Sequence, residues 1–260
     1  KLFRKIIKLN RISYMLYKED LDYFNNELNR QASFWDRFGE KPDFNKKLVL
    51  DFGCGHGATS LDIAKSGAER VVGLDLNKKN IDFAEENLEK NFSQLKNKID
   101  FKKIDINNSN FDIKFDYIIS KEAFEHTQNL DVVLKSMSKI LKKDGKIFSG
   151  FGPLYNFFNG DHGLTKSFLP WFHLILPNSL IMRRVNKGKK EKITSIRQLG
   201  LNMYSLNDYM KIFKNSDFDI QLLKKNCTKN PLAIPFKAIS KIKFLEEFFT
   251  FNIFIILVKK

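Results

Sequence analysis

The sequence predicts an α/β protein with a largely parallel sheet and a nucleotide-type cofactor site. An apolar run at residues 47–51 ends in Asp51 and breaks into a turn with three glycines, and an amphipathic helix pattern begins at Ala58. Further apolar runs downstream end in acidic or polar residues, as strands of such a sheet do. With 260 residues, of which 43% are hydrophobic, the chain can bury the core of one domain with embellishments.

The glycine-rich turn is the strongest motif. Glycines at positions 53, 55 and 57 let the backbone take positive φ and approach a ligand closely. The helix that follows adds unpaired N–H groups at its N-terminus. Residues 53–58 satisfy the dinucleotide pattern G-x-G-x-x-[GA]. They also fit a loop for S-adenosylmethionine (SAM), in which an acid, here Asp51, stands two places before the first of three alternating glycines.

The order of the remaining elements discriminates between these two cofactors. Beyond the first strand and helix, the sequence predicts strands at residues 70–75, 98–105, 115–120, 146–149, 217–225 and 252–259. It predicts a helix at residues 130–143 and a loop at 142–145 before the fifth strand. A Ser205-x-x-Asp208 pattern resembles a helix capping signal.

In this order the motifs resemble the class I SAM-dependent methyltransferases, in particular the broad family with small-molecule acceptors. The resemblance implies a Rossmann-like, seven-stranded methyltransferase sheet with helices on both faces and an antiparallel last strand between its neighbours. It implies one domain, 1–260, in four stretches. These are an N-terminal helical extension at 1–45, a SAM-binding core at 46–151, a helical substrate-cover insert at 152–203, and the C-terminal part of the core at 204–260.

The resemblance also implies the cofactor contacts. We expect SAM, and its product S-adenosylhomocysteine, to contact Asp51, Gly53, Cys54, Gly55, Gly57, Asp75, Leu76, Asn77, Asp105, Ile106, Ser120 and Lys121. The loop after Asp51 would hold the methionine part, Asp75 the ribose, and Asp105 and Ile106 the adenine. Ser120 and Lys121 would lie close to the sulfonium.

The expected chemistry is an in-line attack on the sulfonium methyl, for which the enzyme aligns the nucleophile and excludes water. An oxygen nucleophile also benefits from a base at its proton. His126, after the fourth strand, and His162, in the insert, are the two candidates, and the sequence leaves the choice open. The sequence has no metal-ligand cluster, so we expect metal-independent transfer.

The insert supplies the expected acceptor contacts, which are Tyr155, Asp161, Trp171 and His173. His173 lies in an apolar segment, where a histidine is more often a satisfied core residue. We predict methylation, at oxygen, of a small molecule or glycan precursor. Because a basic surface attracts anions, this acceptor could carry negative charge.

Charge and amphipathicity keep three alternatives open. The net charge of +15 and the basic loop at residues 183–190 would suit an RNA methyltransferase, but no separate RNA-binding module is visible, so we do not expect nucleic acid as partner. Residues 2–16 form a basic amphipathic pattern that either covers the cofactor or lies on a membrane, which would suit a lipid or quinone acceptor. The third alternative is a protein that binds SAM but has no methyltransferase activity.

Cysteine usage and hydropathy predict the compartment. Cys54 and Cys227 form neither a disulfide framework nor a redox motif, and no apolar run reaches the length of a membrane span. We therefore expect a cytoplasmic protein, with peripheral membrane contact left open. The sequence does not predict an oligomeric state.

Overall fold

The protein is described by a computed structural model that places residues 17–165, 169–228 and 230–260. Its strands form a seven-stranded sheet in the order β3-β2-β1-β4-β5-β7-β6. The predicted fold class is confirmed, including an antiparallel last strand that pairs with a neighbour on each side. The chain divides into two compact units, residues 1–119 and 120–260.

The first unit holds the parallel strands. They are β1 (Leu48–Phe52), β2 (Arg70–Asp75) and β3 (Ile99–Lys103), and β4 (Phe115–Lys121) begins in this unit. The helices are a segment at residues 17–29, α2 (Gln31–Asp36), α3 (Ala58–Lys65) and α4 (Lys78–Asn91), with short 3₁₀ turns η1 (Ser93–Leu95) and η2 (Ile106–Asn108). The register pairs Phe52 with Leu74 and Asp75 with Lys103, so the ends of these strands lie at one edge of the sheet.

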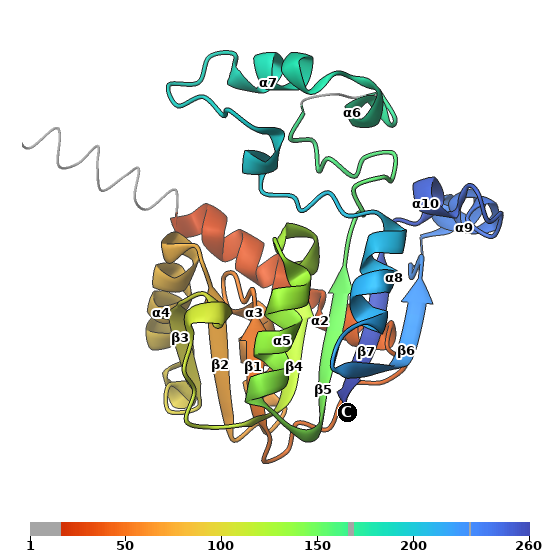
Figure 1. Ribbon diagram of the computed structural model, residues 1–260. Helices are drawn as coiled ribbons and strands as arrows, with labels where there is room; N and C mark the ends of the chain where they lie inside the picture. The colour runs from red at the N-terminus through yellow and green to blue at the C-terminus, as the bar shows by residue number, and fades with distance from the viewer. Residues whose placement is uncertain (1–16, 166–168, 229) are drawn as a thin grey trace, which may run out of the picture. The chain divides into compact units, whose positions relative to one another are not determined.

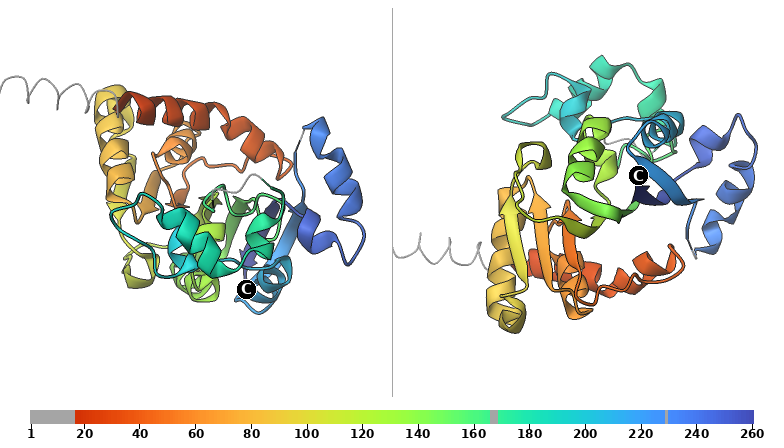
Figure 2. Two further views of the ribbon diagram at one scale, coloured as in Figure 1. Left: turned by 90° about the horizontal axis from the view of Figure 1, so that it is seen from above. Right: turned by 60° about the horizontal axis from the view of Figure 1, so that its bottom comes forward.

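The middle of β1 is buried, as expected for a parallel strand covered on both faces. Helices α3 and α4 both contact β2 and β3. The α2 helix is tied to α3 by the Trp35 indole N–H, which donates to Asp62 Oδ2 at 2.8 Å. Figure 2 shows the helix at residues 17–29 running past the end of α4. The amphipathic pattern predicted at residues 2–16 lies outside the described residues.

The second unit contains the 3₁₀ turn η3 (Phe124–His126), α5 (Leu130–Ile140), β5 (Leu141–Phe151), α8 (Leu206–Lys214), β6 (Phe218–Lys225) and β7 (Ile253–Lys259). Figure 1 shows β5, β7 and β6 side by side. The first five residues of β7 are all buried, which explains its continuous apolar run. The capping signal before α8 is confirmed, because Ser205 and Asp208 exchange side-chain and backbone hydrogen bonds.

Two boundaries differ from the prediction. The helix expected at residues 130–143 ends at Ile140, and the expected loop at 142–145 belongs to β5. Lys259 on β7 explains this end, because its ammonium group donates to the Leu141 carbonyl at 2.9 Å. The third strand ends at Lys103, so Asp105 lies in the turn that follows.

A further difference is a helical pair between β6 and β7 that the sequence pattern did not predict. Its members are α9 (Ile234–Ile239) and α10 (Glu246–Phe249). Both helices are short, and apolar residues alternate irregularly with lysines around them, so no helical period stands out.

The insert at residues 152–203 is helical, as expected. It contains α6 (Phe172–Ile175), α7 (Asn178–Asn186) and the 3₁₀ turn η4 (Ile196–Leu199). Ile181, Val185 and Ile196 are buried and form a small core of the insert's own. None of the helices that the structure describes combines the length and hydropathy needed to cross a membrane.

Candidate active site

The glycine turn after β1 adopts the conformation that its sequence predicts. Gly53, Gly55 and Gly57 have φ of 73°, 52° and 84°, in the left-handed region that favours glycine. A Cβ at Gly57 would meet the Phe101 ring at 2.6 Å, so this position needs glycine for packing as well. A Cβ at Gly55 would meet nothing within 4 Å. The loop is therefore packed behind Gly57 and open beside Gly55, where a ligand can approach the backbone.

Asp75 at the end of β2 holds this loop in place. Its Oδ2 accepts the Gly55 N–H at 2.9 Å, and its Oδ1 accepts the Asn77 N–H at 2.7 Å. Each carboxylate oxygen keeps a further lone pair, which can accept a ribose hydroxyl. Leu76 is 67% exposed although it is a large apolar residue, so its side chain is available to contact a ligand. The Asn77 side chain caps α4 by accepting the Lys79 N–H.

Two further residues, one at the end of β1 and one in the turn, are buried. Asp51 is 1% exposed, and its Oδ2 accepts the Ser60 hydroxyl at 2.6 Å, which compensates part of the cost of burying a carboxylate. Burial, and the negative charges of Asp51 and Asp75, raise the pKa of the Cys54 thiol. Cys54 is therefore a neutral packing residue at neutral pH, not a nucleophile.

The expected adenine residues lie in the turn after β3. Asp105 accepts the Asn107 N–H at 2.9 Å and so caps η2, and the Ile106 side chain is 3% exposed. The Asp105 carboxylate is thus positioned by local hydrogen bonding, whereas Ile106 mainly packs in the core.

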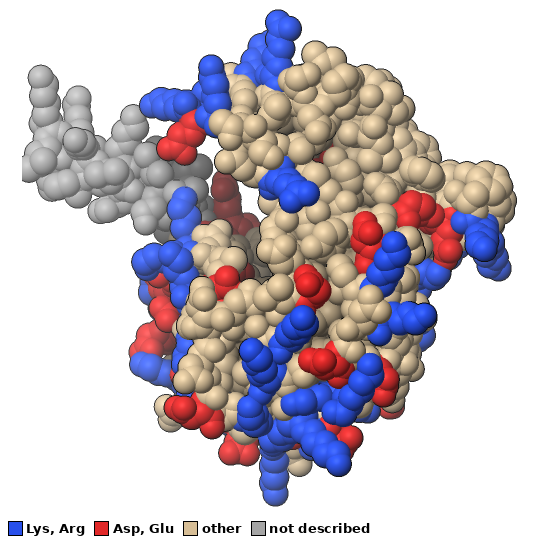
Figure 3. Space-filling model, viewed as in Figure 1, with Lys and Arg blue, Asp and Glu red and all other residues tan. Residues whose placement is uncertain are grey.

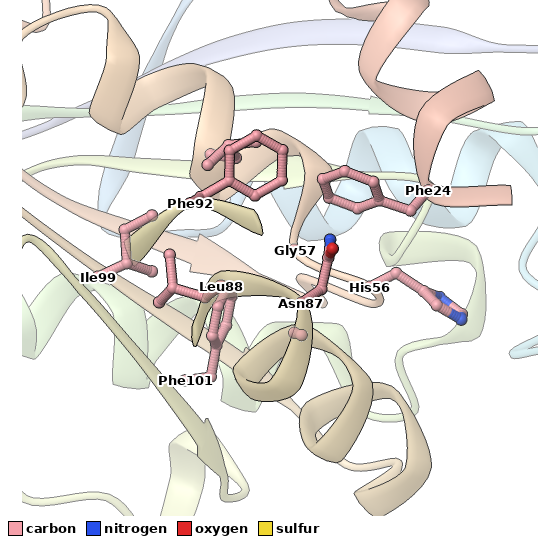
Figure 4. Close-up of a pocket in the computed structure, with 10 residues that line it drawn as sticks. Phe24, His56, Gly57, Asn87, Leu88, Phe92, Ile99 and Phe101 are labelled. Carbon is pink, nitrogen blue, oxygen red and sulfur yellow. The ribbon is translucent and has the colours of Figure 1, made fainter. Parts of the chain in front are cut away.

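A small pocket lies behind the glycine turn and is lined mostly by apolar side chains, including Phe24, Leu88, Phe92 and Phe101 (Figure 4). The pocket lies between the helix at residues 17–29 and α4, which both contribute lining residues. His56, which the sequence analysis did not single out, connects this helix to the glycine turn. Its Nε2 lies 3.1 Å from Asp20 Oδ1.

These features fit SAM. The open space at Gly55 can admit the methionine part, and Asp75 can accept the ribose hydroxyls. Leu76 offers an apolar surface to a base. Ser120, in the second unit at the end of β4, is fully buried, and its hydroxyl has no hydrogen-bond partner within the described chain. Ser120 is followed by Lys121, which is partly exposed.

The second unit brings the two histidine candidates together. The rings of His126 and His162 lie 5.3 Å apart, edge to face. His126 Nδ1 lies 2.8 Å from the Gly200 carbonyl oxygen, and His162 Nε2 lies 3.0 Å from the Pro153 carbonyl oxygen. Since a carbonyl oxygen can only accept, each of these nitrogens carries the proton. In the neutral rings, His126 Nε2 and His162 Nδ1 therefore hold lone pairs that can accept a proton.

Burial is the largest influence on the pKa of His162, which it lowers below the ordinary value of 6.5. The neighbouring His126 acts in the same direction. His162 therefore stays neutral, and able to act as a base, at pH values where an exposed histidine is partly protonated.

Glu125 is a buried acid that sequence reasoning missed. It is 3% exposed, its Oε1 accepts the Gly152 N–H at 3.1 Å, and its Oε2 has no partner among the placed residues. Burial raises the pKa of Glu125 to about 8. The only signal in the sequence was its place beside His126.

The remaining acceptor candidates are held by contacts within the second unit. His173 is 4% exposed, and its Nε2 lies 2.6 Å from the Tyr155 carbonyl oxygen, as in a satisfied core histidine. Asp161 is buried and accepts the Thr165 hydroxyl at 2.5 Å. Trp171 is partly buried, and its indole N–H has no partner within the ranges that the structure describes. Acceptor binding by these four residues stays a prediction.

No group of three or more His, Cys, Asp or Glu side chains in the described ranges could hold a metal ion. Metal-independent transfer remains an expectation from the sequence.

Comparisons with known proteins agree with this geometry. Residues 43–152 match a family described as a methyltransferase domain. The ubiquinone biosynthesis O-methyltransferase of Pelagibacter ubique is 42% identical over 112 residues, which are 43% of this chain and 44% of that protein. The enzyme of the same name from Bartonella tribocorum is 26% identical over 200 residues, 70% of this chain and 74% of that protein. The match to the Pelagibacter relative thus spans less than half of its length.

Two solved structures show the same fold. A SAM-dependent methyltransferase from Mesorhizobium loti aligns with a TM-score of 0.58 at 13% identity, over 88% of this chain and 97% of that one. Magnesium protoporphyrin IX methyltransferase from Synechocystis with bound S-adenosylhomocysteine aligns with a TM-score of 0.54 at 16% identity, over 93% and 86%. Residues 43–152 thus match a methyltransferase domain, and the chain has the fold of these SAM-dependent methyltransferases.

Proposed function

We propose that the protein transfers the methyl group of SAM to an oxygen atom of a small molecule, and that the acceptor is a phenolic precursor of a quinone. The acceptor class is supported by the Pelagibacter and Bartonella relatives, both named ubiquinone biosynthesis O-methyltransferases. A glycan precursor, which the sequence also suggested, has no such support among these relatives.

The observation that carries oxygen methylation is the His126–His162 pair. Each ring donates its N–H to a backbone carbonyl and keeps a lone pair on the other nitrogen. A phenol has a pKa of about 10, so at neutral pH it needs a base to become a good nucleophile. Two imidazole rings whose centres lie 5.3 Å apart can supply that base and receive the proton.

The other residues have supporting roles. When bound, SAM supplies an activated methyl group, so the protein has little covalent chemistry to perform. The Gly53–Gly57 turn and Asp75 would hold the cofactor, and the insert would exclude water from the acceptor. Tyr155, Asp161, Trp171 and His173 are the insert residues that we expect at the acceptor.

The test is a methylation assay with methyl-labelled SAM. The purified protein is offered a dihydroxybenzoate as the phenolic probe and, separately, a primary amine of similar size. We expect labelled methyl ether from the phenol and no labelled amine. A labelled amine without labelled ether would overturn oxygen methylation. Labelled ether from a sugar hydroxyl, but not from any phenol, would overturn the quinone-precursor class.

A further inference from the structure

The α9–α10 pair, with the segment that joins the two helices, forms a projection between β6 and β7. We call residues 231–249 the helical hairpin. The segments that flank the hairpin are joined to each other: the Cys227 N–H donates to Asn252 Oδ1 at 2.8 Å, and the Asn252 side-chain amide donates to the Cys227 carbonyl at 3.1 Å. Inside the hairpin, the rings of Phe236 and Phe249 lie 6.0 Å apart. The hairpin therefore has a defined structure anchored to the sheet.

Large apolar side chains remain exposed on this anchored element. Phe244 is 77% exposed, the highest value among large apolar side chains of the described residues, and Ile234 is 62% exposed. Ile242 and Phe248 are 46% and 40% exposed. An ordered element that keeps such a group of side chains in water marks an interaction surface.

The exposed charges beside these side chains, Lys241 and Lys243, are both positive. Of the hairpin's two acids, Glu246 pairs with Lys225, and Glu247 Oε1 accepts the Leu206 N–H at 2.8 Å, so both are directed to the rest of the unit. Lys241 and Lys243 are exposed and have no ion-pair partner in the part of the chain that the structure describes. Figure 3 shows uncharged surface next to basic and acidic side chains in the region of α9 and α10.

The tip of the hairpin combines both features. Residues 241–244 read Lys-Ile-Lys-Phe, and all four are exposed. Two lysines with flexible stems can keep their ammonium groups at phosphate depth while the neighbouring apolar side chains enter a hydrocarbon layer. Apolar burial and attraction to anionic headgroups then add to the same contact.

We propose that the helical hairpin is a membrane-docking element that places Ile242 and Phe244 in the acyl boundary of an anionic bilayer, with Lys241 and Lys243 at the headgroups. A protein partner fits less well, since a stable protein interface needs about 800 Å² on each side and a tip of four residues offers much less. The proposal does not depend on the identity of the methyl acceptor.

The test is sedimentation of the full chain with vesicles, either phosphatidylcholine alone or phosphatidylcholine mixed with phosphatidylglycerol. We expect binding to the mixed vesicles and little binding to the neutral ones. Phe244→Ser should weaken partitioning about tenfold or more, because the side chain no longer enters the lipid. Lys241→Gln with Lys243→Gln should weaken it about tenfold on the mixed vesicles, as two headgroup attractions are lost.

Matched controls come from α5, where Val132 is 44% exposed and Lys135 is also exposed. Val132→Ser and Lys135→Gln should leave partitioning unchanged. Equal melting temperatures and equal SAM affinity would show that the hairpin variants are folded. Absence of binding to the mixed vesicles would overturn the proposal. Binding that persists in the Phe244 and lysine variants would overturn it as well, and would assign the contact to another part of the chain.

Discussion

The imidazole rings of His126 and His162 lie edge to face 5.3 Å apart, although 36 positions separate them in the sequence. Each ring is oriented by a different backbone carbonyl, Gly200 for His126 and Pro153 for His162. The pair thus presents two oriented lone pairs near each other. Either His126 or His162 could therefore be the base, and experiment can distinguish the two.

Replacing the base should lower turnover strongly. We expect His126→Gln or His162→Gln, whichever removes the true base, to lower kcat by about 10² to 10⁴ while SAM affinity holds. The other variant is the control and should change mainly KM for the acceptor. Steady-state kinetics with the phenolic probe and calorimetry with SAM separate these effects. If both variants kept the parental kcat, the histidines would not supply the base.

The pH profile gives independent evidence. Because burial lowers the pKa of His162, a His162 base would keep the rate high as the pH falls through about 6.5 and lose it only at lower pH. The measurement is kcat/KM for the parent and for His126→Gln across the acidic range. A parental profile that already falls above pH ~7 would argue against His162 as the base.

Gly55 should tolerate no side chain once cofactor binds. Gly55→Ala is expected to weaken SAM binding at least about tenfold, because a methyl group would occupy the open space beside the loop. Gly188 is the matched control, since it also has positive φ, 77°, and open surroundings but lies in the insert. Both variants bear the backbone strain of about 1–2 kcal/mol, so a loss of affinity in Gly55→Ala alone would locate the ligand. Calorimetry with equal affinity for both would refute this placement.

Asp75 should contribute both to the loop and to the ligand. Asp75→Ala removes the acceptor of the Gly55 N–H, and we expect SAM affinity to fall about 10- to 100-fold. Asp100→Ala is the control, because Asp100 is a partly exposed acid on β3 that pairs with Arg70. Titration calorimetry of the two variants measures the difference. Preferential binding of a nicotinamide dinucleotide by the parent would contradict the cofactor assignment.

Glu125 should make stability depend on pH. Its pKa is about 8 in the folded protein and about 4.5 when unfolded, so the folded state binds the extra proton between these values. Its contribution is therefore complete below pH ~4.5 and is lost as the pH rises through about 8, with a slope of up to about 1.4 kcal/mol per pH unit. Glu125→Gln, which resembles the protonated acid, should flatten this dependence. Urea unfolding at several pH values measures it, and parallel curves for parent and variant would exclude the raised pKa.

Local patterns explain what the sequence could predict. The glycine turn, the strand endings at Asp75 and the capping pair Ser205–Asp208 each depend on residues close in the chain, so their conformations follow from short-range chemistry. The contacts that were missed are distant in sequence. The end of α5 depends on Lys259, and the orientation of His126 depends on Gly200, 74 positions away. Such tertiary contacts have no local signature.

The 3₁₀ turn η3 contacts both ends of the insert. Glu125 Oε1 accepts the Gly152 N–H at the start of the insert, and the Glu125 carbonyl accepts the Asn202 N–H at its end. The Asn202 side chain adds hydrogen bonds to the Phe124 and Thr127 carbonyls. The insert thus begins and ends beside the same 3₁₀ turn, η3. Because both ends are held at this turn, the length of the insert can change while the strands around it keep their register.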